Sequence, residues 1–134
     1  KMHHGYTYGG YNLAAAAAVK TIEIIRRPGF LEHVRHVGAI LKDRLTKLQV
    51  DYPFIGDVRG VGLMLGVELV KENGDRNPEL AARFSQVALQ HNMIMRVNEH
   101  GRGNVLEIRP ALVLTEDEAH EIADRVGEVC EALK

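Results

Sequence analysis

The chain has 134 residues, of which 46% are hydrophobic, so it can bury the core of one compact domain. Its 17 basic and 18 acidic residues nearly cancel, which gives no electrostatic reason to expect nucleic acid or an anionic membrane surface as a partner. The single cysteine, Cys130, excludes an internal disulfide and favours a cytoplasmic location. The longest apolar run, residues 13–19, is too short to cross a bilayer, so no membrane span is expected.

Two helices are predicted in the first part of the chain. A glycine-rich loop over residues 5–10 precedes an alanine-rich segment, residues 13–24, with strong helix propensity. Residues 28–29, a Pro-Gly pair, end that helix. Apolar positions over residues 31–48 then recur at spacings of three, four and seven, which predicts an amphipathic helix with one buried face. The Tyr-Pro pair at residues 52–53 ends it.

The middle of the chain changes to strand patterns. From residue 55 we expect one strand, because residues 62–70 alternate between apolar and other side chains next to flanking glycines. A helix should begin at Pro78 and end near Asn92. Two short apolar segments, residues 93–97 and 104–109, follow, and their Glu-His-Gly-Arg-Gly connection suggests a hairpin with a loose loop.

The last helix has the clearest sequence signal. Thr115 and Glu118 form the S/T-x-x-E capping pattern, and apolar residues follow at helical spacing to Leu133. The order is therefore two helices, strand, helix, two strands, helix. This order predicts an α/β fold of the α+β type, a small, mostly antiparallel sheet covered by helices on one side.

The Gly-Tyr-Thr-Tyr-Gly-Gly loop at residues 5–10 is a candidate phosphate site. It offers the Thr7 hydroxyl and several backbone N–H groups, with a helix beginning just after it. Glycine-rich loops before helices are also common without any ligand. From the loop alone, a phosphate contact and a plain connecting loop both remain open.

Arg109 is the candidate carboxylate-binding residue, because it stands at the end of a predicted strand directly before Pro110. A planar guanidinium can hold a carboxylate through two parallel hydrogen bonds. Strand alternation places Glu107 on the same face, so Arg109 could equally be a surface arginine paired with that acid. Both interpretations remain open at this point.

The other candidate chemical groups have ordinary interpretations. His33 and His36 lie three apart on the second helix, but no carboxylate or cysteine stands near them as a metal site would require, so no metal is expected. His3 and His4 lie near the start of the chain without a visible nucleophile or orienting acid. Cys130 falls in the apolar stripe of the last helix and is expected in the core.

Three ordered segments together resemble the class III aminotransferases, which are fold-type I enzymes that use pyridoxal 5'-phosphate (PLP) and include ornithine, acetylornithine and 4-aminobutyrate transaminases. The first is His4–Gly10 with the alanine-rich helix after it. The second is Gly56–Met64 running into Gly66–Leu69, and the third is Ile108–Leu112 before Thr115. The resemblance covers nearly the whole chain, and it departs from the family at residues 11–13, where Asn-Pro is usual, and at Ala111, where proline is common.

The resemblance implies specific roles for the candidate residues. Thr7, with Tyr6 beside it, would bind the cofactor by contacting its phosphate in the active site of the other subunit of a homodimer. Arg109 would bind a carboxylate of the substrate. Residues 1–27 would be the phosphate-contact loop and the connecting helix from the large domain, and residues 28–134 the C-terminal small domain.

The implied activity is transfer of an amino group between an amino acid or amine and a keto acid. In the family, the cofactor lysine and the acid that pairs with the pyridine nitrogen lie upstream of the threonine loop, so Lys20 is not expected to take that role, no catalytic residue is assigned within this chain, and the chain alone should be inactive. Its beginning at Lys1, in a glycine- and tyrosine-rich stretch, suits part of a longer protein. Two alternatives stay open: a PLP-dependent mutase, epimerase or decarboxylase of the same family, and a free-standing α/β ligand-binding or dimerisation module without catalysis.

Overall fold

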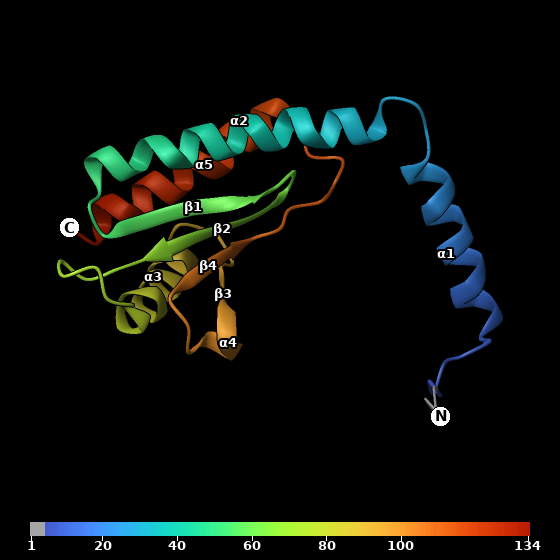
Figure 1. The fold of residues 1–134 in the computed structure, drawn as a ribbon, viewed down its shortest axis with the longest axis horizontal. Coiled ribbons are helices and arrows are strands. Elements are labelled where there is room, and N and C mark those ends of the chain that lie inside the picture. The colour runs from blue at the N-terminus through green and yellow to red at the C-terminus, as the bar shows by residue number, and fades with distance from the viewer. Residues whose placement is uncertain (1–4) are drawn as a thin grey trace. The chain divides into compact units, whose positions relative to one another are not determined.

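A computed structural model describes residues 5–134, which form two compact units (Figure 1). The first unit ends at His33 and contains helix α1, and the second begins at Val34 and contains the sheet. The boundary after residue 27 that the sequence suggests stays a prediction. Within residues 5–134, no helix combines the length and the apolar character that a membrane span requires. The elements are α1 Asn12–Ile25, α2 Phe30–Asp51, β1 Ile55–Val61, β2 Met64–Leu69, α3 Pro78–Gln90, β3 Arg96–Val97, α4 Asn98–Gly101, β4 Val105–Ile108 and α5 Glu116–Ala132.

The sheet has four antiparallel strands in the order β1-β2-β4-β3. The predicted antiparallel sheet is confirmed, but the expectation of one strand from residue 55 is wrong. The segment folds back on itself as a hairpin in which Val61 pairs with Met64. Gly62, at φ +54°, opens the two-residue connection, and this left-handed conformation is one that glycine adopts without a steric penalty. The alternation of side chains continues across this turn, which is why the pattern resembles a single strand.

Helix α2 lies very close to that hairpin turn. A Cβ atom added to Gly38, which is buried in α2, would lie 2.3 Å from the carbonyl oxygen of Gly62. Real Cβ atoms do not approach backbone oxygens so closely, so glycine at position 38 is what permits this contact. The contact sets the distance between α2 and the β1–β2 hairpin turn.

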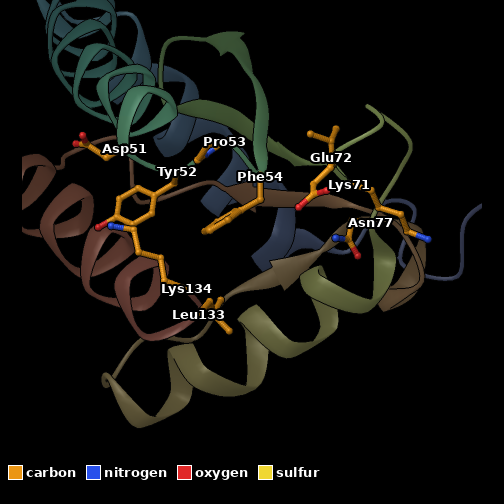
Figure 2. Close-up of a pocket in the computed structure, with 10 residues that line it drawn as sticks. Asp51, Tyr52, Pro53, Phe54, Lys71, Glu72, Asn77, Leu133 and Lys134 are labelled. Atoms are coloured by element: carbon orange, nitrogen blue, oxygen red, sulfur yellow. The ribbon is translucent and has the colours of Figure 1, made fainter.

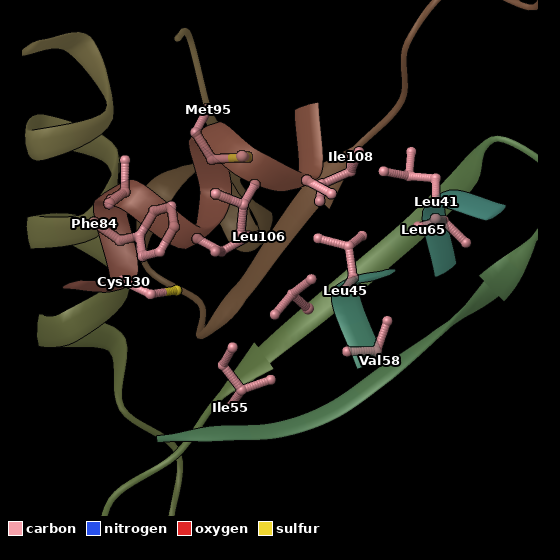
Figure 3. Close-up of a cluster of buried hydrophobic side chains, with 14 of the residues drawn as sticks. Leu41, Leu45, Ile55, Val58, Leu65, Phe84, Met95, Leu106, Ile108 and Cys130 are labelled. Atoms are coloured by element: carbon pink, nitrogen blue, oxygen red, sulfur yellow. The ribbon is translucent and has the colours of Figure 1, made fainter. Parts of the chain in front are cut away.

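The helices of the second unit cover one face of the sheet, and Figure 1 shows α2 and α5 lying side by side. His36 Nε2 lies 3.0 Å from Glu116 Oε1, and Arg44 pairs with Asp124, so polar contacts join the two helices at the start of α5 and near its middle. The buried face is made by alternate strand residues together with apolar residues of α2, α3 and α5 (Figure 3). The largest fully buried apolar side chains are Phe84, Leu41, Leu45, Leu69, Leu106, Val37, Val67, Val126 and Val129.

The helix starts follow from local sequence. Thr115 and Glu118 form the reciprocal capping box predicted for α5, with the Glu118 carboxylate accepting from the Thr115 backbone N–H at 2.8 Å. These hydrogen bonds hold the pKa of Glu118 below its usual value. Pro78 occupies the first turn of α3, and Asn77 accepts a hydrogen bond from the Leu80 N–H at 3.1 Å. The starts of α3 and α5 therefore agree with the sequence predictions.

The predicted pairing between residues 93–97 and 104–109 is confirmed, although β3 contains only Arg96 and Val97. The connection is an ordered turn instead of the expected loose loop. Glu99 and His100 have φ values of +53° and +55°, which non-glycine residues adopt only at a steric cost. An ion pair of 2.6 Å between Arg76 and Glu99 holds the turn in place.

We predict that Gly38→Ala destabilises the fold by roughly 1–3 kcal/mol, because the added methyl group would overpack the contact with Gly62. Urea unfolding of the chain measures this effect. Gly127→Ala in helix α5 is the matched control, since the added Cβ would make an ordinary 3.6 Å contact with Leu48 Cδ2 of α2. The control should gain about 0.5–1 kcal/mol from helix propensity. A Gly38→Ala protein as stable as the unmodified one would show that the close approach does not constrain the fold.

Candidate functional site

The first group of candidate residues lies in the loop before α1. Tyr6 and Thr7 are exposed, and a turn brings the Gly9 N–H to 2.9 Å from the Tyr6 carbonyl oxygen. The Thr7 hydroxyl has no hydrogen-bond partner within residues 5–134. Helix α1 begins without a side-chain cap at Tyr11, so the N–H groups of its first turn are also left for other partners. A hydroxyl and free N–H groups close together in sequence match what a phosphate group requires.

The second group lies on the face of the sheet that no helix of its unit covers, called here the open face. Glu107 of β4 pairs with Arg96 of β3, whose Nε lies 3.2 Å from Glu107 Oε2. The same oxygen accepts a hydrogen bond from Arg109, two residues along the chain. Sequence reasoning left two interpretations of Arg109 open, and within the chain itself the guanidinium binds the carboxylate of Glu107.

The arginine side chains remain accessible in this cluster of Arg96, Glu107 and Arg109. The Arg109 side chain is 49% exposed and that of Arg96 is 64% exposed, whereas Glu107 is only 24% exposed. All three residues line a cavity of about 310 Å³, together with Met93, Ile94, Met95, Ile108, Pro110 and Ile122. Two guanidinium groups share one carboxylate, so one net positive charge faces this cavity. The cavity therefore favours a small anion with an apolar body.

A second ionic cluster lies next to this one on the open face, on β1 and β2. Arg59 of β1 pairs with both Asp57 and Glu68, and the amide of the buried Asn104 donates to Glu68 Oε1 at 3.1 Å. Arg59 first, and Asn104 second, hold the pKa of Glu68 below its usual value. Arg76 completes the contacts of Asn104 by donating to its side-chain oxygen at 3.1 Å. Every charged side chain here has an ion-pair partner, which for Arg76 is Glu99 of the β3–β4 turn, and this is typical of a structural network.

A cavity of about 360 Å³ lies beside the start of β1 and the segment after β2 (Figure 2). Lys134 Nζ lies 4.7 Å from the centre of the Tyr52 ring, and the Tyr52 hydroxyl donates to Glu131 at 3.0 Å. Burial first, and the Glu131 contact second, raise the pKa of Tyr52. Two acids and two lysines line this cavity, so its charges balance and select no ligand class. Register places it at the opposite end of β2 from Arg109, because Ile55 pairs with Leu69 whereas Leu65 pairs with Ile108.

The remaining candidate groups have structural surroundings. His36 contacts Glu116, and Lys20 pairs with Glu23 at 2.9 Å on exposed α1. Among residues 5–134, no cluster of three or more histidine, cysteine or acidic side chains is arranged to hold a metal ion. His3 and His4 lie outside the described residues. Cys130 is fully buried in the core, as predicted.

Comparison with known proteins assigns the family. The profile of the family described as Aminotransferase class-III matches residues 1–130. The chain belongs to the class III aminotransferases. It is 40% identical over 118 residues to an alanine/serine racemase of Pyrococcus horikoshii and 33% identical over 139 residues to a diaminobutyrate–2-oxoglutarate transaminase of Halomonas elongata. These matches cover 87% and 97% of this chain but only 24% and 29% of those proteins.

The fold of this class III chain also matches solved structures of the family. A PLP-bound amine transaminase from an uncultivated Pseudomonas species superposes with a TM-score of 0.84 and 29% sequence identity, over 99% of this chain and 30% of that one. The superposition confirms the expected fold, a small antiparallel sheet with helices from the C-terminal part of a fold-type I enzyme. The chain spans about 24–30% of the length of these relatives.

Arg96 is the one member of this class III chain's arginine cluster that sequence reasoning did not identify. Its proximity to Glu107 depends on the register of the β3–β4 pair, in which Arg96 lies opposite Glu107. A one-residue shift in that register would place Arg96 on the buried face. Because the connecting turn uses two non-glycine residues at positive φ, no standard turn pattern fixed the register in advance.

We predict that Cys130 does not react with thiol reagents while the chain is folded. Burial raises the pKa of its thiol to about 12, so the reactive thiolate is scarce at pH 8 as well as inaccessible. The measurement is the rate at which an aromatic disulfide reagent releases its coloured thiolate at pH 8, in buffer and in denaturing urea. Rapid reaction in buffer alone would contradict the buried placement, whereas reaction only in urea agrees with it.

Proposed function

We propose that this chain is the C-terminal part of a PLP-dependent aminotransferase that transfers an amino group between an amino acid or amine and a keto acid. The observation that carries the proposal is the pair of accessible arginines, Arg96 and Arg109, around one carboxylate in a chain of the class III family. Amino acids and keto acids share a carboxylate, and a guanidinium binds it through paired N–H donors. Arg109 then holds the substrate carboxylate and fixes the orientation of the substrate.

The residues of the first unit fit the phosphate of the cofactor. Thr7 offers an exposed hydroxyl without a partner among the described residues, and the uncapped start of α1 supplies backbone N–H groups in the same region of the chain. We propose that Thr7, with Tyr6 beside it, holds the phosphate of PLP bound in the other subunit of a homodimer. When bound, PLP supplies the electron sink that the chemistry at the substrate requires. The lysine that attaches the cofactor is proposed to lie outside this chain, so residues 1–134 alone are expected to be inactive.

The racemase relative supports a second candidate function. At 40% identity over 118 residues, the alanine/serine racemase of Pyrococcus horikoshii shows that a chain this similar occurs in a protein named for a different reaction. Keto-acid dependence separates the two functions, since a transaminase needs an amino acceptor and a racemase needs none. A free-standing binding or dimerisation module is a third reading, and it requires that no cofactor bind the full-length protein. Cytoplasmic location remains part of the proposal, supported only by the single free cysteine.

We predict that Thr7→Ala lowers the affinity of the full-length protein for PLP by about 10- to 100-fold, because it removes one hydrogen bond to a charged group. Cofactor retention after gel filtration, followed by the absorbance of PLP, measures the change. Thr7→Ser is the matched control, since it keeps the hydroxyl and should retain the cofactor. Equal retention by all three proteins would remove the phosphate role of Thr7.

We predict that Arg109→Gln raises the KM for amino acids and keto acids by about 10- to 100-fold and changes kcat less, because it removes a charge-assisted contact to the substrate. Steady-state kinetics of the full-length enzyme with a carboxylate-bearing donor and with a carboxylate-free primary amine measure this effect. Arg109→Lys keeps the positive charge but lacks the planar guanidinium, so its KM should lie between those of the unmodified enzyme and Arg109→Gln. A KM for the carboxylate-bearing donor that does not change would argue against the site.

A further inference from the structure

The structure places Glu107 at the centre of one row that crosses all four strands. By register, Arg59 of β1 lies opposite Gly66 of β2, Gly66 opposite Glu107 of β4, and Glu107 opposite Arg96 of β3. Gly66 lies between Arg59 and Glu107 in this row and has no side chain that could contact the Glu107 carboxylate. The polar side chains bonded to the Glu107 carboxylate are therefore Arg96 and Arg109.

Arg109 itself stands just beyond the sheet. Strand β4 ends at Ile108, and Pro110 follows Arg109 at once, so the ladder of β4 does not extend to Arg109. Its side chain is 49% exposed, and Glu107 is the one residue among those described with which it forms an ion pair. A free arginine side chain has many rotamers and loses about 2 kcal/mol of conformational entropy when fixed. Glu107, inside β4 and only 24% exposed, can supply a fixed point for it.

A single Glu–Arg pair would neutralise the guanidinium that must attract a substrate carboxylate. Arg96 changes that balance, because its Nε binds the same carboxylate oxygen at 3.2 Å. With two guanidinium groups and one carboxylate, the cluster keeps one positive charge. A guanidinium has five N–H donors, so binding Glu107 leaves donors of Arg109 for a second carboxylate.

We propose that Glu107 is a positioning residue for substrate binding. Glu107 orients the guanidinium of Arg109 on the open face, while Arg96 offsets the negative charge of Glu107. This inference rests on the proposed function, since it concerns how the same site takes the carboxylate of an amino or keto acid. Glu107 acts through Arg109 and does not contact the substrate. Carboxylate-free amines do not use Arg109, so Glu107 has no effect on their binding.

The test is Glu107→Gln in the full-length holoenzyme. It keeps the size of the side chain and removes the charge that holds Arg109. The KM for a carboxylate-bearing amino donor and for its keto-acid acceptor should rise by about three- to tenfold, because the guanidinium must then be ordered during binding. The kcat should stay within about twofold, and the KM of a carboxylate-free primary amine should not change. Glu107→Asp keeps the charge and should restore part of the affinity.

Glu68→Gln is the matched control, because Glu68 is also an open-face acid paired with an arginine, Arg59, on the same sheet. It should leave the KM for carboxylate substrates unchanged. A lower KM in Glu107→Gln would show that Glu107 competes with the substrate, and an unchanged KM would show that Arg109 is positioned without it. Either result overturns the inference, as does an equal rise for the carboxylate-free amine.

Failure of the inference and failure of the proposed function give different results. If Arg109→Gln raises the KM but Glu107→Gln does not, the carboxylate site stands and the role of Glu107 falls. If the unmodified holoenzyme transfers no amino group between any amino donor and keto acid, the proposed function fails and takes the inference with it.

Discussion

The strict alternation of side chains along β2 and β4 is the constraint on which the rest of the second unit depends. Leu65, Val67 and Leu69 point to one side of the sheet, and Leu106 and Ile108 lie opposite or beside them on the same side. The same alternation puts Glu68 and Glu107 on the open face. Because the period of a strand is two, burying the apolar set determines where the charged set must lie. The core and the arginine cluster are therefore two results of one register.

The helices are held over that sheet by contacts that tolerate little change. Gly38 permits α2 to approach the hairpin turn at Gly62. Polar contacts such as the Arg44–Asp124 pair then join α2 to α5, where the acidic side chains of α5 face basic and histidine side chains of α2. Exposed pairs of this kind contribute at most about 1 kcal/mol each, so the buried core supplies most of the stability. Their more definite effect is to fix the relative placement of the two helices.

The sequence predicted those elements whose signals are local. The capping box of Thr115 and Glu118, the first-turn Pro78 and the apolar stripe that includes Cys130 all appear as expected. The hairpin at Gly62 was missed, because a two-residue turn with glycine at its first position interrupts neither the alternation nor the run of apolar residues. Arg96 was missed for a different reason. Its side chain reaches Glu107 only through a pairing across strands, and sequence spacing does not specify such a pairing when the turn has no standard pattern.

The arrangement of Arg96, Glu107 and Arg109 is difficult to explain by stability alone. Exposed ion pairs contribute little to folding. The Arg59 cluster, in which one arginine pairs with the two acids Asp57 and Glu68, carries an excess negative charge. The arginine cluster instead keeps an excess positive charge, and it does so on accessible side chains beside an apolar cavity. An unbalanced guanidinium that already binds one carboxylate has the geometry and the charge to bind another. The proposed carboxylate site depends on that imbalance more than on the presence of any single arginine.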